Sequence, residues 1–214
     1  MKKIVIIGVG GFGREVKTLI DQINQINPQY IIDGFYDDAE NLESFYNGIK
    51  FLGNIDELNE ITEQTAVVLG IGDPKIKSKI INKLTNPNLV FPALIHPSAI
   101  VGNDDIKIGM GTIIAAGCIV TCNIKLGNFV TLNLSCTVGH DTIIKDYSSF
   151  MPSVNISGEV IVHENVYVGT GAKIINQLEI GANTIIGAGA VVSKTIPANC
   201  TAVGIPAKPI KYHL

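Results

Sequence analysis

A six-residue repeat of apolar side chains runs through the C-terminal half of the chain. Fifteen consecutive positions spaced by six are all apolar, although only 46% of the whole chain is. These positions are Ile108, Ile114, Val120, Leu126, Leu132, Val138, Ile144, Phe150, Ile156, Val162, Val168, Ile174, Ile180, Ile186 and Val192. Ile95 and Val101 continue the series upstream after a slip of one residue near Asp105. A period of six fits neither an α-helix nor an ordinary strand, so it indicates short strands separated by corners.

Three such hexapeptides make one triangular coil, and successive coils stack by parallel strand pairing. The series therefore predicts a left-handed parallel β-helix over about residues 95–195. Glycine often follows the repeated apolar residue, as at Gly109 and Gly127, and we attribute it to corners that need an unusual backbone conformation. Cys118 and Cys136 lie eighteen residues apart, so we expect them to stack inside the coils as small apolar side chains.

The preceding part of the chain alternates predicted strands with predicted helices. We expect strands over residues 3–7, 31–36, 66–70 and 89–91, and helices over residues 14–26, 55–61 and 74–84. This alternation is typical of an α/β domain with a parallel sheet. We therefore divide the chain into a Rossmann-like domain, residues 1–93, and a β-helical domain with a C-terminal tail, residues 94–214.

Charge and composition narrow the function classes. The net charge is −3 and Arg14 is the only arginine, which argues against a nucleic-acid-binding protein with a basic face. The first apolar run stops after four residues, too short for a signal peptide or a membrane span. We therefore expect a cytoplasmic protein that does not bind membranes. Neither the cysteines nor the histidines have the spacing of metal ligands, so no metal is expected.

The segment Gly8-Val9-Gly10-Gly11-Phe12-Gly13 fits the Gly-x-Gly-x-x-Gly motif between a predicted strand and a predicted helix. Backbone N–H groups at a helix N-terminus can face a phosphate. Asp37 and Asp38 end the second predicted strand, where an acidic residue can hold a ribose hydroxyl. About 90 residues supply only one mononucleotide-binding half, which favours a nucleotide or nucleotide-sugar over NAD. A tight turn without a ligand remains the alternative.

His140 is the candidate general base. It lies on the outward side of a predicted coil beside Asp141, which can orient the imidazole or stabilise its protonated form. Gly158 lies eighteen residues later, one coil above, and its N–H is a candidate donor to an oxyanion. An exposed histidine without a role is the alternative. We expect His96 to be structural and His163 to be solvated.

Six segments together resemble one bacterial enzyme family. They are the Gly-rich loop, Tyr36-Asp37-Asp38, Gly70-Ile71-Gly72-Asp73, Ile95-His96-Pro97-Ser98-Ala99, Gly139-His140-Asp141 and Val203-Gly204-Ile205-Pro206-Ala207-Lys208. The whole chain resembles the hexapeptide-repeat sugar acetyltransferases of the PglD/NeuD type, which include a UDP-4-amino-sugar N-acetyltransferase and a sialic acid O-acetyltransferase. The resemblance implies acetyl-CoA as co-substrate, a nucleotide-sugar acceptor and a homotrimer with active sites between neighbouring β-helices.

The resemblance also implies roles for individual residues. His140 matches the general base and Asp141 the acid beside it. The acceptor-binding positions are Gly10, Gly11, Phe12, Asp37, Asp38, Gly72 and Asn133. The acetyl-CoA-binding positions are Ser149, Gly158, Thr170 and Ala188. Relatives often carry histidine where this chain has Phe12 and, in some cases, where it has Ser149; the first departure bears on the acceptor sugar and the second on one CoA contact.

The expected reaction is N-acetylation of a nucleotide-linked amino sugar, a UDP-4-amino-4,6-dideoxy sugar, for bacterial surface glycan synthesis. Three alternatives stay open. One is O-acetylation of sialic acid or another sugar. Another is an NAD-dependent enzyme with a β-helical oligomerisation domain, and the third is a catalytically idle scaffold.

Overall fold

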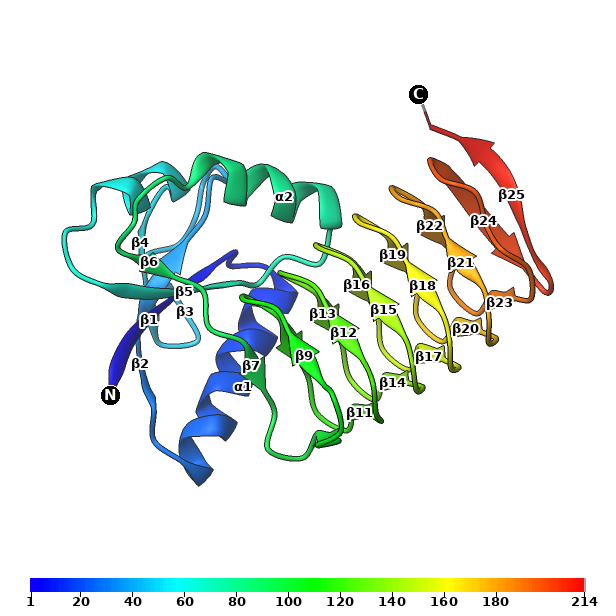
Figure 1. Cartoon of the computed structure of the whole chain (residues 1–214). Coiled ribbons are helices and arrows are strands. Elements are labelled where there is room, and N and C mark those ends of the chain that lie inside the picture. Colours follow the sequence, from blue (N-terminus) through cyan, green and yellow to red (C-terminus); the bar gives the residue numbers. More distant parts are fainter. Residues whose placement is uncertain (214) are drawn as a thin grey trace.

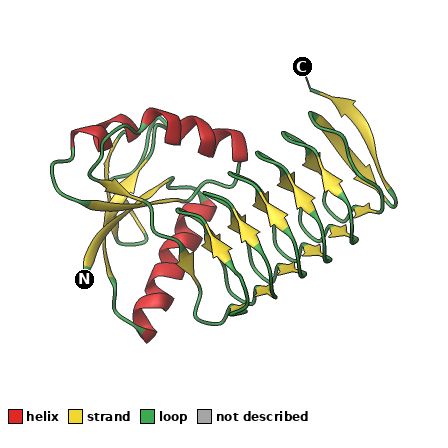
Figure 2. Ribbon diagram, viewed as in Figure 1, coloured by secondary structure: helices red, strands yellow, loops and turns green. Residues whose placement is uncertain are grey.

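The computed structural model describes residues 1–213 and consists of an α/β unit followed by a long β-helix (Figures 1 and 2). The sheet of the first unit has the strand order β3-β4-β2-β1-β5-β6, and all its neighbours are parallel except β3 and β4. Its elements are β1 (Lys2–Ile7), α1 (Gly11–Ile26), β2 (Tyr30–Tyr36), β3 (Phe45–Tyr46), β4 (Ile49–Gly53), the 3-10 helix η1 (Ile55–Glu60), β5 (Thr65–Leu69), α2 (Pro74–Lys83) and β6 (Leu89–Val90).

The central strand β1 is buried on both faces, as a strand covered by helices on either side must be. Ile4 and Ile6 pack with Val16 and Ile20 of α1, whereas Val5 lies in the cluster of η1 and α2 on the opposite face. The predicted strands and helices of this unit are confirmed, with small differences in their ends. The hairpin β3–β4 was not predicted from the sequence, and the predicted helix over residues 55–61 is a 3-10 helix.

The β-helix is built from short strands that stack at an interval of eighteen residues over most of its length. Val138 pairs with Ile156, and Leu126 with Ile144, in parallel register. Its strands are β7 (Leu94–Ile95), β8 (Ile100–Val101), β9 (Lys107–Ile108), β10 (Ile113–Ile114), β11 (Ile119–Val120), β12 (Lys125–Leu126), β13 (Thr131–Leu132), β14 (Thr137–Val138), β15 (Ile143–Ile144), β16 (Ser149–Phe150), β17 (Asn155–Ile156), β18 (Ile161–Val162), β19 (Tyr167–Val168), β20 (Lys173–Ile174), β21 (Glu179–Ile180), β22 (Ile185–Ile186) and β23 (Val191–Val192). They form three sheets, one for each side of the triangle.

The inward positions are those that the sequence indicates. From Ile114 to Val192 every member of the apolar series is at most 3% exposed, and Cys118 and Cys136 are fully buried and unbridged. The predicted fold class is therefore confirmed. Ile95 has the predicted register, opposite Ile114, but it is 37% exposed because it lies in the first coil and no coil covers it from below.

The reason we gave for the repeated glycines is wrong. Positive φ angles occur three residues after the inward aliphatic residue, at Asn123 and Asp141 for example, and not at the glycine that directly follows it. Glycine is required at position 139 because the next coil lies too close for a side chain: a Cβ there would lie 2.6 Å from the Gly158 nitrogen. The glycines allow neighbouring coils to stack at their corners.

The α/β unit packs against the N-terminal coils of the β-helix, which we call the lower coils, and a C-terminal hairpin covers the other end (Figure 1). Leu94 and Ile113 belong to the core cluster of α1, and Phe129 to that of α2. The hairpin, β24 (Cys200–Gly204) and β25 (Ala207–Tyr212), extends the sheet of β22 and was not predicted. The domain boundary at residues 93/94 stays a prediction. No helix among residues 1–213 is long and apolar enough to cross a membrane.

Candidate active site

The corner between β14 and β15 presents the His140 side chain to solvent. Val138 points inward, and the chain then turns through Gly139, His140 and Asp141. Asp141 has φ 57°, a left-handed conformation that aspartate tolerates better than most residues. Its N–H donates to the Cys122 carbonyl at 3.2 Å, which ties the corner to the coil below. The His140 side chain is 57% exposed, so a substrate can reach it from outside the chain.

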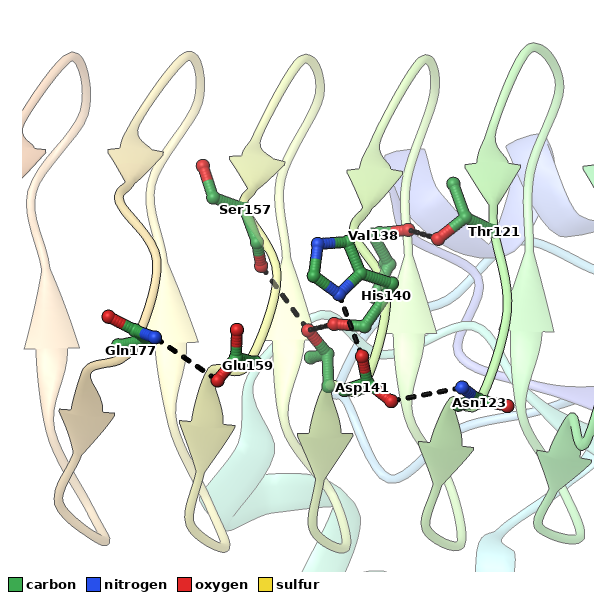
Figure 3. Close-up of polar contacts among 9 residues, drawn as sticks. Thr121, Asn123, Val138, His140, Asp141, Ser157, Glu159 and Gln177 are labelled. Atoms are coloured by element: carbon green, nitrogen blue, oxygen red, sulfur yellow. Dashed lines mark hydrogen bonds and ion pairs between the residues drawn. The ribbon is translucent and has the colours of Figure 1, made fainter.

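His140 and Asp141 form a hydrogen-bonded pair (Figure 3). The distance between His140 Nδ1 and Asp141 Oδ2 is 2.7 Å. Hydrogen bonding to His140, and then to Asn123, lowers the pKa of Asp141, so its carboxylate is ionised and accepts. Nδ1 of His140 consequently carries the hydrogen, and the lone pair of the neutral ring is on Nε2. In this tautomer the nitrogen that points away from Asp141, Nε2, can accept a proton, as a general base must.

Gly158 leaves the space that the imidazole occupies. A Cβ at this position would lie 2.5 Å from His140 Nε2 and Cε1, so any side chain there would collide with the ring. The Gly158 N–H donates no hydrogen bond to another of the described residues. The residue against which the imidazole packs therefore has an N–H without a partner among the described residues.

The Gly-rich loop contains two kinds of glycine. Gly8 has φ +102°, and a Cβ on Gly13 would lie 1.8 Å from the Gly8 carbonyl oxygen, so the fold requires both. Gly10 and Gly11 face open space, and neither has positive φ. Gly10 is the N-cap of α1 without a side-chain cap. The loop therefore leaves backbone donors of the first helical turn accessible, and nothing in the fold explains its two middle glycines.

Asp37 and Asp38 contact the protein backbone. Asp37 Oδ2 accepts from the Val9 N–H at 2.9 Å, which ties the end of β2 to the Gly-rich loop. Asp38 Oδ1 accepts from the Ile55 N–H at 2.9 Å. Both carboxylates therefore shape this edge of the sheet, in addition to any contact with a ligand.

Phe12 and Asn133 line one cavity of about 250 Å³ between α1 and the lower coils. Most of its other lining residues are apolar, with Leu19 and Leu134 among them. His96 closes part of it. Its Nε2 lies 2.9 Å from Gln22 Oε1 and its Nδ1 accepts from the Ser98 N–H. Gly72 lines a different cavity, of about 650 Å³, between α2 and the coils.

Within one chain the predicted residues fall on two different corners. His140 and Gly158 follow β14 and β17, whereas Asn133 follows β13, and Thr170 and Ala188 follow β19 and β22. The sheet that contains β14 and β17 separates the two groups. One chain therefore brings His140 together with Gly158 at one corner, but places the predicted acetyl-CoA-binding residues Thr170 and Ala188 at another.

Ser149 is fully buried in β16, and its Oγ has no hydrogen-bond partner. It lies between Thr131, whose Oγ1 accepts from Lys77 of α2, and Tyr167 of the next coil. A side chain without exposed surface offers nothing for CoA to touch in this conformation. Residues 1–213 contain no cluster of three or more His, Cys, Asp or Glu side chains that could bind a metal ion.

Two polar residues of importance were not predicted. Asn123 donates from Nδ2 to Asp141 Oδ1 at 3.0 Å, and Lys77 is buried between α2 and the coils. The sequence held a signal for Asn123, since it lies eighteen residues before Asp141. It held none for Lys77.

Comparison with known proteins covers both halves of the chain. The family model described as "PglD N-terminal domain" matches residues 3–84, and "Bacterial transferase hexapeptide (six repeats)" matches residues 159–194. GDP-perosamine N-acetyltransferase of Escherichia coli O157:H7 is 32% identical over 96% of this chain and 95% of its own length. The chain belongs to the PglD-type hexapeptide-repeat acetyltransferases.

Solved structures of this acetyltransferase family extend the likeness to three dimensions. Perosamine N-acetyltransferase from Caulobacter crescentus, solved as a histidine variant with CoA and GDP-perosamine, has a TM-score of 0.87 at 28% identity, covering 99% of this chain and 98% of its own. The acetyltransferase domain of PglB from Neisseria gonorrhoeae FA1090, with acetyl coenzyme A, has a TM-score of 0.86 at 28% identity, covering 98% and 99%. The resemblance inferred from sequence is confirmed, and the protein is an acetyltransferase.

Proposed function

We propose that this acetyltransferase transfers the acetyl group of acetyl-CoA to the amino group of a nucleotide-linked sugar. One observation carries the proposal. The exposed His140 ring packs against Gly158, whose N–H has no partner among residues 1–213, while Asp141 holds Nδ1 of the ring at 2.7 Å and leaves Nε2 as the acceptor. This arrangement provides a base and an oxyanion donor in adjacent coils, as acyl transfer to an amine requires. The relatives that act on GDP-perosamine support the same chemistry.

The reaction follows from these positions. The acceptor amine attacks the thioester carbonyl carbon, and His140 Nε2 takes the proton that the nitrogen loses. The Gly158 N–H donates to the oxygen of the tetrahedral intermediate, an effect of about 3 kcal/mol in comparable sites. The C–S bond then breaks, and the CoA sulfur leaves and receives the proton from the imidazolium. Asp141 stabilises the imidazolium while it holds the proton.

The acceptor is assigned to the α/β unit and the cavity beside it. The backbone donors at Gly10 and Gly11 suit a diphosphate, because they lie uncapped at the N-terminus of α1. Asp37, Asp38 and Gly72 complete this proposed region, and Phe12 and Asn133 line the cavity toward the sugar. A UDP-linked 4-amino-4,6-dideoxy sugar is the acceptor that we expect, and the GDP-perosamine relatives make GDP the alternative nucleotide.

A homotrimer is proposed because one chain separates the two halves of the site. The corner with His140 and Gly158 has to meet Thr170 and Ala188 of a neighbouring chain for the base to reach a thioester in that groove. The intervening sheet exposes apolar side chains at its lower end, Ile100 at 64% and Ile119 at 39%, which suits burial against another chain. Ser149 is left out of this groove. Light scattering at micromolar concentration should give a trimer mass, and a monomer mass would contradict a shared site.

The test is release of free CoA thiol from acetyl-CoA with UDP- and GDP-linked amino sugars as acceptors. His140→Ala should lower kcat by about 10²–10⁴-fold, the usual contribution of a general base. Asp141→Asn should cost less, because Asp141 orients the base without taking the proton. The matched control is His163→Ala, which removes an imidazole paired with Glu179 at 3.2 Å on another corner. His163→Ala should leave kcat unchanged.

A normal kcat in His140→Ala would refute the assignment of the base. Mass spectrometry of the product, with and without alkaline hydrolysis, separates the two acyl-transfer alternatives, because an amide survives conditions that cleave an ester. An alkali-labile product would overturn N-acetylation in favour of O-acetylation.

A further inference from the structure

Both carboxylate oxygens of Asp141 are bonded, and only one of them faces the imidazole. Oδ2 lies 2.7 Å from His140 Nδ1, and Oδ1 accepts from Asn123 Nδ2 at 3.0 Å (Figure 3). Asn123 belongs to the coil below, eighteen residues earlier, and its own N–H donates to the Asp104 carbonyl at 2.8 Å. An amide, a carboxylate and an imidazole from two coils thus form one line of hydrogen bonds.

Asp141 needs such a partner because its side chain is 49% exposed. No wall of apolar residues fixes a carboxylate at an exposed corner, and rotation about its last torsion would aim both oxygens away from His140 Nδ1. The backbone of Asn123 is held in place, because it occupies a left-handed corner with φ 55° and its N–H is hydrogen-bonded to the coil below. The hydrogen bond from Asn123 Nδ2 therefore favours one orientation of the Asp141 carboxylate.

The same corner contains a second pair of this kind that lacks an imidazole. Gln177 Nε2 donates to Glu159 Oε2 at 3.2 Å, and both residues occupy equivalent left-handed corner positions. The residue before Glu159 is Gly158, so no histidine can use that carboxylate. Amide–carboxylate pairs between coils therefore occur twice at this corner, and within residues 1–213 only the lower pair is connected to an imidazole.

We propose that Asn123 is a positioning residue of the acetyl transfer, which fixes the carboxylate of Asp141 and, through it, the ring of His140. The inference rests on the proposed function, because it assumes that His140 is the base. Asn123 does not touch the substrates in this assignment. Its loss should therefore lower kcat and leave both KM values unchanged.

The test uses glycine variants, because glycine keeps the left-handed corner without strain. Asn123→Gly removes the donor to Asp141, and Gln177→Gly removes the equivalent donor to Glu159 at nearly the same φ. Asn123→Gly should lower kcat about 3- to 10-fold, the size expected for one exposed hydrogen bond to a charged group. Gln177→Gly should leave kcat unchanged, with a similar small change in Tm.

A double-mutant cycle distinguishes positioning from a general loss of structure. In an Asp141→Gly background, which keeps the left-handed corner at φ 57°, Asn123→Gly should cause no further loss of kcat, because Asn123 acts through Asp141. Additive losses, or an equal loss of kcat in Gln177→Gly, would overturn the inference, as would a normal kcat in Asn123→Gly while His140→Ala is inactive. A normal kcat in His140→Ala would instead refute the proposed function.

Discussion

Replacement of Lys77 by methionine should reveal the cost of burying a lysine between α2 and the β-helix. The Lys77 side chain is 1% exposed, and its Nζ donates to the Phe129 carbonyl at 2.6 Å and to Thr131 Oγ1 at 3.1 Å. Burial lowers the pKa of Lys77 from 10.5 to about 7, against a smaller opposing effect of Asp73. Methionine has a similar length and no charge, so Lys77→Met removes the titration and keeps much of the volume.

The magnitude follows from this difference in pKa. A fall from 10.5 to about 7 corresponds to about 5 kcal/mol, at about 1.4 kcal/mol per pH unit. Below about pH 7 both the folded and the unfolded chain hold the proton, so the folded state bears the full cost of a buried ammonium. Between about pH 7 and 10.5 the unfolded chain binds more protons, so the free energy of unfolding contributed by Lys77 rises with pH.

Urea denaturation of both proteins, at one protein concentration and at several pH values from about 6 to 9, measures this contribution. The free energy of unfolding of Lys77→Met minus that of the wild type should fall by about 2 kcal/mol between about pH 7 and 9. A constant offset, from the unsatisfied Phe129 carbonyl, does not affect the slope. Lys79→Met, on the exposed face of the same helix, is the control and should give a difference that does not vary with pH. A constant difference for Lys77→Met as well would refute the reasoning.

Three further changes test the site and the core. Gly158→Ala should lower kcat by about 10²-fold or more with little change in Tm, because the new Cβ would displace the half-exposed His140 ring; a normal kcat would show that the ring adapts. Ile156→Asp should prevent folding, since it buries an unpaired carboxylate, and soluble protein with a normal Tm would contradict its inward position. Gly11→Val should raise the acceptor KM with unchanged Tm, because Gly11 faces open space; loss of acetyl-CoA binding, measured by calorimetry, would reassign the loop.

The sequence alone determined the features that depend on local periodicity. The inward positions of the β-helix repeat every six residues, and each strand needs only its own alternation of side chains to place them. The same holds for α1, whose apolar residues Val16, Ile20 and Ile23 recur at helical spacing. His140 was identifiable because an outward histidine beside a carboxylate can be read from the repeat itself, and Asn123 was within reach of the same eighteen-residue interval.

Only the tertiary structure decided what depends on contact between elements. The sequence does not show whether a glycine is needed for a left-handed backbone or because another segment lies too close for a Cβ. At Gly139 the structure shows the second reason, since the neighbouring coil leaves no space for a side chain. Ser149 and Lys77 are polar residues for which no sequence pattern indicates burial, yet both are buried. Lys77 of α2 is buried where it meets Phe129 and Thr131 of the β-helix, and neither surface carries a sequence repeat that indicates the contact. The separation of His140 from Thr170 and Ala188 has the same origin, because the direction in which a corner faces is set by the stacked coils as a whole.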